Sequence, residues 1–174
     1  MELKKFRLLF DKDVEQNWLN EMCQRGWALK NFRLGVYTFE SCQPGEYIYQ
    51  VDLLPGSGFQ PNDPEGYAEF MEETGVEVVC RWFRWIILRK KAAEGPFDIY
   101  TDAESQIQLY SRIRTMFLFG LGLELCCSAS VWTNLHNGGI FFYLLAALYL
   151  VIFAAFLRIV LICNQKIKEL EAQK

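Results

Sequence analysis

Two apolar stretches decide the architecture of this chain: Thr115 to Thr133, TMFLFGLGLELCCSASVWT, and Gly138 to Leu157, GGIFFYLLAALYLVIFAAFL. Glu124 is the only charged residue of the first stretch, and the second contains none. A helix needs about 20 apolar residues to cross the hydrocarbon core of a bilayer, and each stretch has about that length. The residues between them, 134–139, have the composition of a turn. The pattern therefore predicts an antiparallel hairpin of two transmembrane helices.

Lys and Arg residues near the ends of the two stretches predict the orientation of the hairpin. Arg112 and Arg114 precede the first stretch, Lys166 and Lys168 follow the second, and the turn has neither Lys nor Arg. Because cytoplasmic ends carry the excess of positive charge, we expect a multi-pass protein of the cell membrane with both termini in the cytoplasm. Two buried helices in a large soluble core are the alternative, but the chain offers too little other protein to cover them.

The composition limits the other classes of function. The 174 residues carry a net charge of -3, which argues against nucleic-acid binding. The six cysteines form no C-x-x-C pair, which favours reduced thiols. His136 is the only histidine and has no other good ligands nearby, so we expect no metal and no cofactor. Glycine-rich phosphate loops and catalytic triads are also absent from the sequence, which predicts no catalytic residues.

Charged residues are concentrated before Arg114, and this region has the pattern of a small α+β domain. Asp13 with Gln16 is expected to begin the first helix and Asp63 with Pro64 the second. Strands are expected at 4–10, 36–40, 47–53 and 76–80, with a hairpin turn at 43–45. Residues 85–89 either continue the last strand or form a further one.

This order, β-α-β-β-α-β with possibly one more strand, predicts a ferredoxin-like head in which two helices cover one face of an antiparallel sheet. The other face would be open, and Tyr37, Tyr47 and Tyr49 are candidates for a ligand-binding surface there. Cross-strand aromatic packing is the alternative for these three side chains. Thr101 with Glu104 predicts the start of a helix that runs without a break into the first membrane span.

The expected segments follow from these patterns. They are a cytoplasmic α+β domain at 1–95, a helical stalk at 96–114, transmembrane helices at 115–133 and 140–163, an outer turn at 134–139, and a cytoplasmic tail at 164–174.

Several short motifs in the head resemble a known bacterial family, the domain of unknown function 2812. The motifs are Trp18-Leu19-Asn20-Glu21-Met22, Gly26-Trp27-Ala28-Leu29, Tyr37-Thr38-Phe39, the run from Gly45 to Asp52, Glu72-Glu73-Thr74-Gly75, and Arg89-Lys90-Lys91 before Glu94-Gly95-Pro96-Phe97. The resemblance covers Lys4 to about Arg114. It implies a membrane tail of two or more spans and a gene near PadR-type regulators. It implies no catalytic residues, because members of the family have no assigned activity.

Glu124 is the most informative residue of the first span, because a carboxylate near the middle of a membrane costs roughly 2.5–3.5 kcal/mol on insertion scales. Small residues accompany it on two stripes that would let helices approach closely. Two interpretations are equally supported: an interface with a protein partner or a second copy, and a protonated side chain facing the other helix of its own hairpin. The predicted helix-interface residues are Gly120, Glu124, Ser128, Gly122 and Cys126.

Basic residues of the head and of the helix ends are expected to meet anionic lipid headgroups. They are Arg84, Arg89, Lys90, Lys91, Arg112, Arg114, Arg158, Lys166 and Lys168. The aromatic residues around Arg84 could instead fill the core.

The sequence favours a membrane-anchored cytoplasmic sensor or adaptor domain of unknown ligand, and the family resemblance implies a place in a regulatory or stress-response unit. An accessory subunit of a membrane transporter is the alternative, with the hairpin as its functional part. An enzyme acting on a lipid or small metabolite would need a pocket with a carboxylate of shifted pKa.

Overall fold

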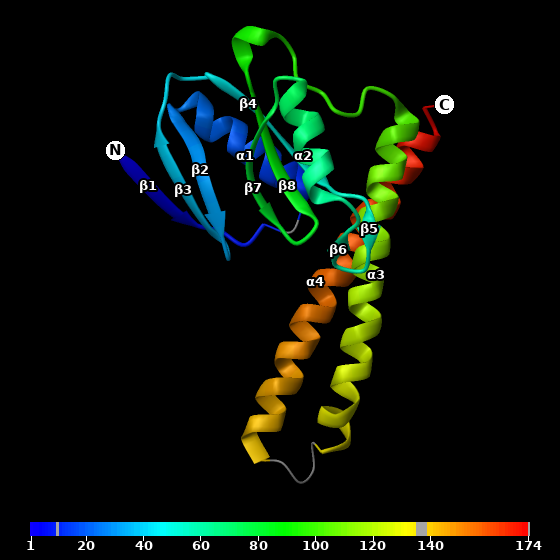
Figure 1. Ribbon diagram of the computed structural model, residues 1–174. Helices are drawn as coiled ribbons and strands as arrows, with labels where there is room; N and C mark the ends of the chain where they lie inside the picture. Colours follow the sequence, from blue (N-terminus) through cyan, green and yellow to red (C-terminus); the bar gives the residue numbers. More distant parts are fainter. Residues whose placement is uncertain (10, 135–138, 174) are drawn as a thin grey trace. The chain divides into compact units, whose positions relative to one another are not determined.

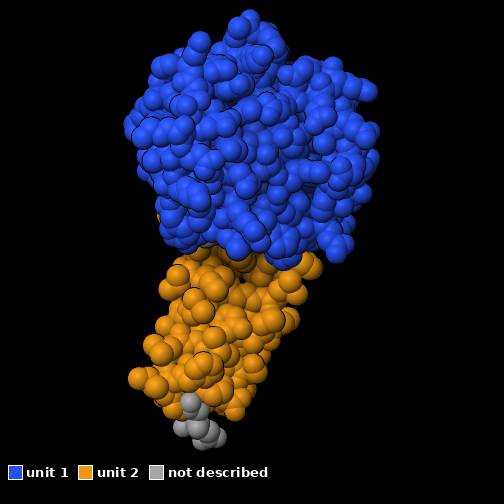
Figure 2. Space-filling model, turned by 60° about the vertical axis from the view of Figure 1, so that its left-hand side comes forward, with its two compact units in different colours: residues 1–101 blue, residues 102–174 orange. Residues whose placement is uncertain are grey.

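The chain folds into a mixed N-terminal part followed by two long apolar helices, so the predicted α+β class is confirmed. The computed structural model describes residues 1–9, 11–134 and 139–173. It divides into two compact units, Met1–Thr101 and Asp102–Lys174 (Figure 2). We call them the head and the hairpin.

The head consists of two successive β-α-β-β units, each with its own three-stranded antiparallel sheet (Figure 1). The first contains β1 (Glu2–Phe6), α1 (Lys12–Gln24), β2 (Trp27–Arg33) and β3 (Val36–Ser41), with strand order β1-β3-β2. The second contains β4 (Tyr47–Leu53), α2 (Pro64–Glu73), β7 (Glu77–Trp82) and β8 (Trp85–Lys91), with strand order β4-β8-β7. A two-stranded ribbon of β5 (Gly56–Ser57) and β6 (Gln60–Pro61) lies between β4 and α2 in the sequence.

The two β-α-β-β units match in detail, which identifies the head as a structural tandem repeat. In both, the middle strand of the sheet is the last strand of the repeat. Both helices end on a C-cap with nearly identical backbone angles, φ -88° and ψ 6° at Arg25 and φ -88° and ψ 7° at Thr74. Four features recur at one constant interval of sequence: these C-caps, the glycines Gly26 and Gly75, the bulges after Leu29 and Val78, and the turn residues Leu34 and Phe83.

The strand pairing differs from the expected single sheet. The predicted β-hairpin between residues 36–40 and 47–53 does not form, because β3 pairs with β1 and β2 while β4 pairs with β8. Strand β2 was not predicted, since its bulge between Leu29 and Asn31 breaks the alternation of apolar and polar residues. Of the two alternatives for residues 85–89, the further strand is confirmed as β8, which forms a hairpin with β7.

Side-chain caps set the starts of the helices. Asp63 caps α2 as predicted, accepting from Gly66 N, and Pro64 is its first residue. The other two caps lie close to the predicted positions but not at them. Asp11 caps α1 in place of Asp13, and Asp102 caps the first long helix in place of Thr101. An aspartate side chain directly before the first turn satisfies amide groups that have no partner within the helix.

The main core of the head is enclosed by α1 and both sheets. The outer edge of β4 is closed by α1 side chains: the Asn20 amide group accepts from Tyr49 N (2.8 Å) and donates to Tyr49 O (3.0 Å). Gln16 Oε1 accepts from Val51 N (3.2 Å). A second core lies on the α2 side of β8. The buried residues of the main core are Trp18, Leu19, Met22, Cys23, Leu29, Tyr37, Phe39, Tyr49, Val51 and Ile87, and those of the second are Leu54, Met71, Val76, Ile86 and Leu88.

The hairpin consists of α3 (Ala103–Thr133) and α4 (Gly139–Glu171), and the 3₁₀ helix η1 (Ala92–Glu94) precedes it in the head. Both helices are long enough and apolar enough to cross a membrane. At 1.5 Å per residue they extend over roughly 45–50 Å, more than the ~30 Å of a hydrocarbon core. Phe117 packs edge-on against Phe156 at 5.2 Å between ring centres. The predicted outer turn and His136 fall largely on 135–138, outside the described residues.

Candidate functional site

The tyrosines predicted to line a ligand surface are part of the core instead. Tyr37 and Tyr49 are buried in the main core, because the second sheet covers the face that the single-sheet plan left open. The Tyr49 hydroxyl accepts from Leu29 N (2.8 Å). Tyr47 is half-buried beneath the Arg89 guanidinium, which lies 4.4 Å from its ring centre. The packing alternative therefore holds for Tyr37 and Tyr49.

Glu15 is an ionisable group of the head that the sequence did not single out. The Tyr37 hydroxyl donates to Glu15 Oε1 at 2.7 Å. Burial raises the pKa of Glu15 to about 7, against the smaller lowering effect of this hydrogen bond. Burial, with the nearby charge of Glu15, also raises the pKa of Cys80 to about 12, so its thiol stays protonated at neutral pH. This arrangement can respond to pH but provides no nucleophile.

A second unpredicted group is centred on Asp52, which is fully buried in β4. Its Oδ1 accepts from Leu53 N (2.7 Å) and the Tyr100 hydroxyl (2.8 Å), and its Oδ2 accepts from the Tyr67 hydroxyl (2.7 Å). The carboxylate thus joins β4 to α2 and to the segment that leads into α3. An aspartate within the apolar strand YIYQVDL was the sequence signal for such a group.

The predicted lipid-facing basic residues of the head have mixed positions. Arg84 is buried, and its guanidinium donates to Leu54 O (2.9 Å) and Gly58 O (3.0 Å), so the prediction that it contacts lipid is wrong. Arg89 makes a two-pronged ion pair with Glu77, with both distances 2.8 Å. Among these four predicted residues of the head, only Lys91 is exposed, and Lys90 is half-buried.

The basic residues of the hairpin lie on α3 and α4 outside or at the edge of the apolar stretches. Arg114 donates to Asn164 Oδ1 (3.1 Å), which joins the two helices there. The others are Arg112, Arg158, Lys166 and Lys168, of which Arg158 and Lys168 are exposed.

Glu124 and its neighbours separate into two faces of α3. Gly120, Glu124 and Ser128 are buried, whereas Gly122 and Cys126 are exposed. Glu124 is 8% exposed, and neither carboxyl oxygen has a hydrogen-bond partner among the described residues. Ser128 does not supply one, because its hydroxyl donates to Leu125 O of its own helix. An unpartnered carboxyl therefore lies inside the hairpin, and the second small-residue stripe faces outward.

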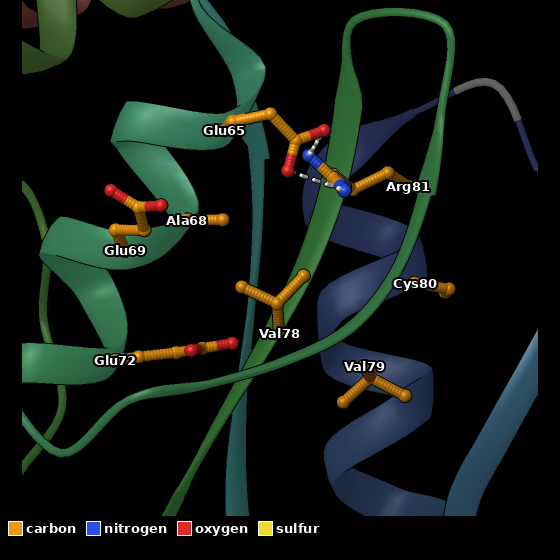
Figure 3. A pocket seen from close by; sticks show the side chains of 8 residues that line it. All are labelled: Glu65, Ala68, Glu69, Glu72, Val78, Val79, Cys80 and Arg81. Atoms are coloured by element: carbon orange, nitrogen blue, oxygen red, sulfur yellow. Dashed lines mark hydrogen bonds and ion pairs between the residues drawn. The ribbon is translucent and has the colours of Figure 1, made fainter.

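A groove of about 430 Å³ lies on the head between α2 and β7 (Figure 3). Glu65 reaches across it to Arg81, with distances of 3.1 and 3.3 Å between the charged groups. Glu69 and Glu72 add two further carboxylates from the same helix. Glu65, Glu69 and Glu72 follow one another at intervals of about one helical turn, which was visible in the sequence. The described residues contain no group of three or more side chains suited to a metal ion.

Comparison with known proteins adds one finding. The family model described as "Protein of unknown function (DUF2812)" matches residues 11–121, from the cap of α1 into α3. No curated protein and no solved structure shows a significant match.

Proposed function

This chain belongs to the family of proteins of unknown function DUF2812, and we propose that it is a membrane-anchored cytoplasmic sensor or adaptor in a regulatory or stress-response unit. The surface of α4 carries this proposal. Only 6% of the residues in its most apolar stretch are buried, so most of its apolar side chains are at least partly exposed and need an apolar environment, which lipid supplies. The head has its own two cores, as a separately folded binding module requires.

Membrane fractionation and thiol labelling test the anchor and its orientation. We expect the full chain to stay in the membrane fraction after a carbonate wash. In intact cells, an impermeant maleimide should label Asn134→Cys but not Gln173→Cys, with the wild-type chain as control for its native thiols. Release by carbonate would contradict the anchor. Labelling only at position 173 would contradict the orientation.

The groove between α2 and β7 is the surface that we propose for a protein partner. Its carboxylates favour a partner segment with basic side chains, because complementary charge steers association. We expect a photo-crosslinker at position 65, an exposed position that lines the groove, to capture a partner in native membranes. The double change Glu69→Lys and Glu72→Lys should abolish this crosslink. The matched pair Glu21→Lys and Glu73→Lys, exposed residues outside the groove, should not.

The unpartnered Glu124 carboxyl supports a second candidate, an accessory subunit of a membrane transporter. A buried carboxyl without a partner would gain a hydrogen bond from a polar group of another membrane protein. In native gels of mildly solubilised membranes, Glu124→Ala should dissociate such a complex. Glu124→Gln, which retains hydrogen-bonding capacity, should preserve it. An unchanged complex with Glu124→Ala would remove this candidate.

A further inference from the structure

Each repeat of the head ends its β-hairpin in a two-residue turn that presents a bulky apolar side chain. The register pairs Arg33 with Val36 and Trp82 with Trp85, so the turns begin at Leu34 and Phe83. These are the two non-glycine residues with positive φ in the described parts of the chain, at 49° and 54°. Bulky residues rarely adopt this conformation, and Gly, Asn or Asp usually occupy such turns. Strained positions of this kind cluster at functional surfaces.

The two turns lie at the same end of the head (Figure 1). Phe32, just before the first turn, contacts Trp82, just before the second, with 5.9 Å between ring centres. Leu34 is 66% exposed and Phe83 is 61% exposed. Other exposed apolar side chains surround them. The side chains of Phe6 and Leu8 flank the first turn, because a Cβ atom built on Gly35 would lie 3.0 Å from a carbon atom of each. Phe59 lies beside Phe83 at the second turn.

Cations accompany this apolar surface. Arg33 precedes the first turn, and Arg7 lies across it, its amide donating to Gly35 O at 2.8 Å. Both side chains are exposed, and neither takes part in the ion pairs found among the described residues. The Arg7 guanidinium lies over the Trp18 ring, 4.6 Å from its centre. Apolar side chains next to arginines that lack an acidic partner match the interface of an anionic leaflet, where the apolar groups enter the acyl region and the arginines meet phosphates.

We propose that the head docks on the lipid bilayer through these two β-turns, with Leu34 and Phe83 inserted at the level of the headgroups. The inference rests on the proposed membrane anchor. Because the anchor keeps the head near one leaflet, even a weak contact of the turns with lipid would be occupied much of the time. Docking of this kind would fix the orientation of the head at the leaflet.

The test uses the full chain in nanodiscs of phosphatidylcholine with a minor fraction of phosphatidylglycerol. An environment-sensitive fluorescent amino acid is placed at position 34, 83 or 43, and the lipid carries a doxyl quencher near the headgroup. Gln43 is the matched control, an exposed loop residue beyond the opposite end of β3. We expect about twofold stronger quenching at 34 and 83 than at 43.

A second variant keeps the fold while removing the apolar side chains of the two turns. Leu34→Asn with Phe83→Asn retains residues that accept positive φ. With the fluorophore at position 36, the chain that keeps Leu34 and Phe83 should be quenched. The double change should abolish this quenching. Equal quenching at all positions, or none at 34 and 83 in nanodiscs that contain the chain, would overturn the inference and leave the anchor intact. Shielding of the turns only in native membranes would assign them to a protein partner instead. Failure of the chain to enter nanodiscs would overturn the anchor itself.

Discussion

Replacement of Glu15 by Gln should make the stability of the head less dependent on pH. Burial raises the pKa of Glu15 from 4.5 to about 7, so the folded head binds this proton more tightly than the unfolded chain does. The contribution of protonated Glu15 to the stability of the folded head is therefore complete below about pH 4.5 and is lost as the pH rises through about 7. Above that range the folded head contains a poorly solvated carboxylate, which Gln would replace with a neutral group able to accept the Tyr37 hydrogen bond.

The size of the effect follows from the pKa difference. A shift of one unit corresponds to about 1.4 kcal/mol, which sets an upper limit of about 3 kcal/mol. Since Glu15 is only half-buried, solvent screening reduces this figure, and we expect about 1–2 kcal/mol. Glu15→Gln should be more stable than the wild type by this amount at pH 8. It should be equal or slightly less stable at pH 4.5.

Urea unfolding of the full chain in mild detergent measures this difference. Trp18 reports on the site, because its ring meets that of Tyr37 at 4.8 Å. Glu21→Gln, an exposed carboxylate on the same helix, is the matched control and should follow the wild type at every pH. Parallel pH profiles for Glu15→Gln and the wild type would refute the reasoning, as would a loss of stability in Glu15→Gln at pH 8.

Five further substitutions test three other parts of the structure. Leu34→Gly and Phe83→Gly should each stabilise the head by about 0.5–1 kcal/mol in urea titrations, because Gly relieves the left-handed backbone; a loss of stability would place the residues in an unstrained conformation. Asp52→Ala should destabilise the head by about 3 kcal/mol, since one buried and two half-buried donors lose their acceptor, whereas Tyr100→Phe should cost about 1 kcal/mol; equal effects would assign the whole contribution to the Tyr100 contact. Arg84→Met should cost about 2 kcal/mol by leaving the carbonyls of Leu54 and Gly58 without this donor, and an unchanged unfolding midpoint would show that water replaces it.

The sequence alone determined the features that depend on short-range pattern. The length and apolar composition of 115–133 and 138–157 specify α3 and α4, because a helix satisfies its backbone hydrogen bonds within itself. The Asp63-Pro64 start of α2 is local in the same sense. The unpaired position of Glu124 was foreseeable, since few polar residues occur in either stretch.

Only the tertiary structure decided which strands pair and which side chains are buried. Strand pairing joins residues distant in sequence, so local alternation could not distinguish a β3–β4 hairpin from the observed pairing of β4 with β8. The division into two sheets then placed Tyr37 and Tyr49 in a core and buried Arg84, whose sequence neighbours suggested a surface. The tandem repeat is likewise a property of the backbone, because its matching bulges, caps and turns are occupied by different side chains.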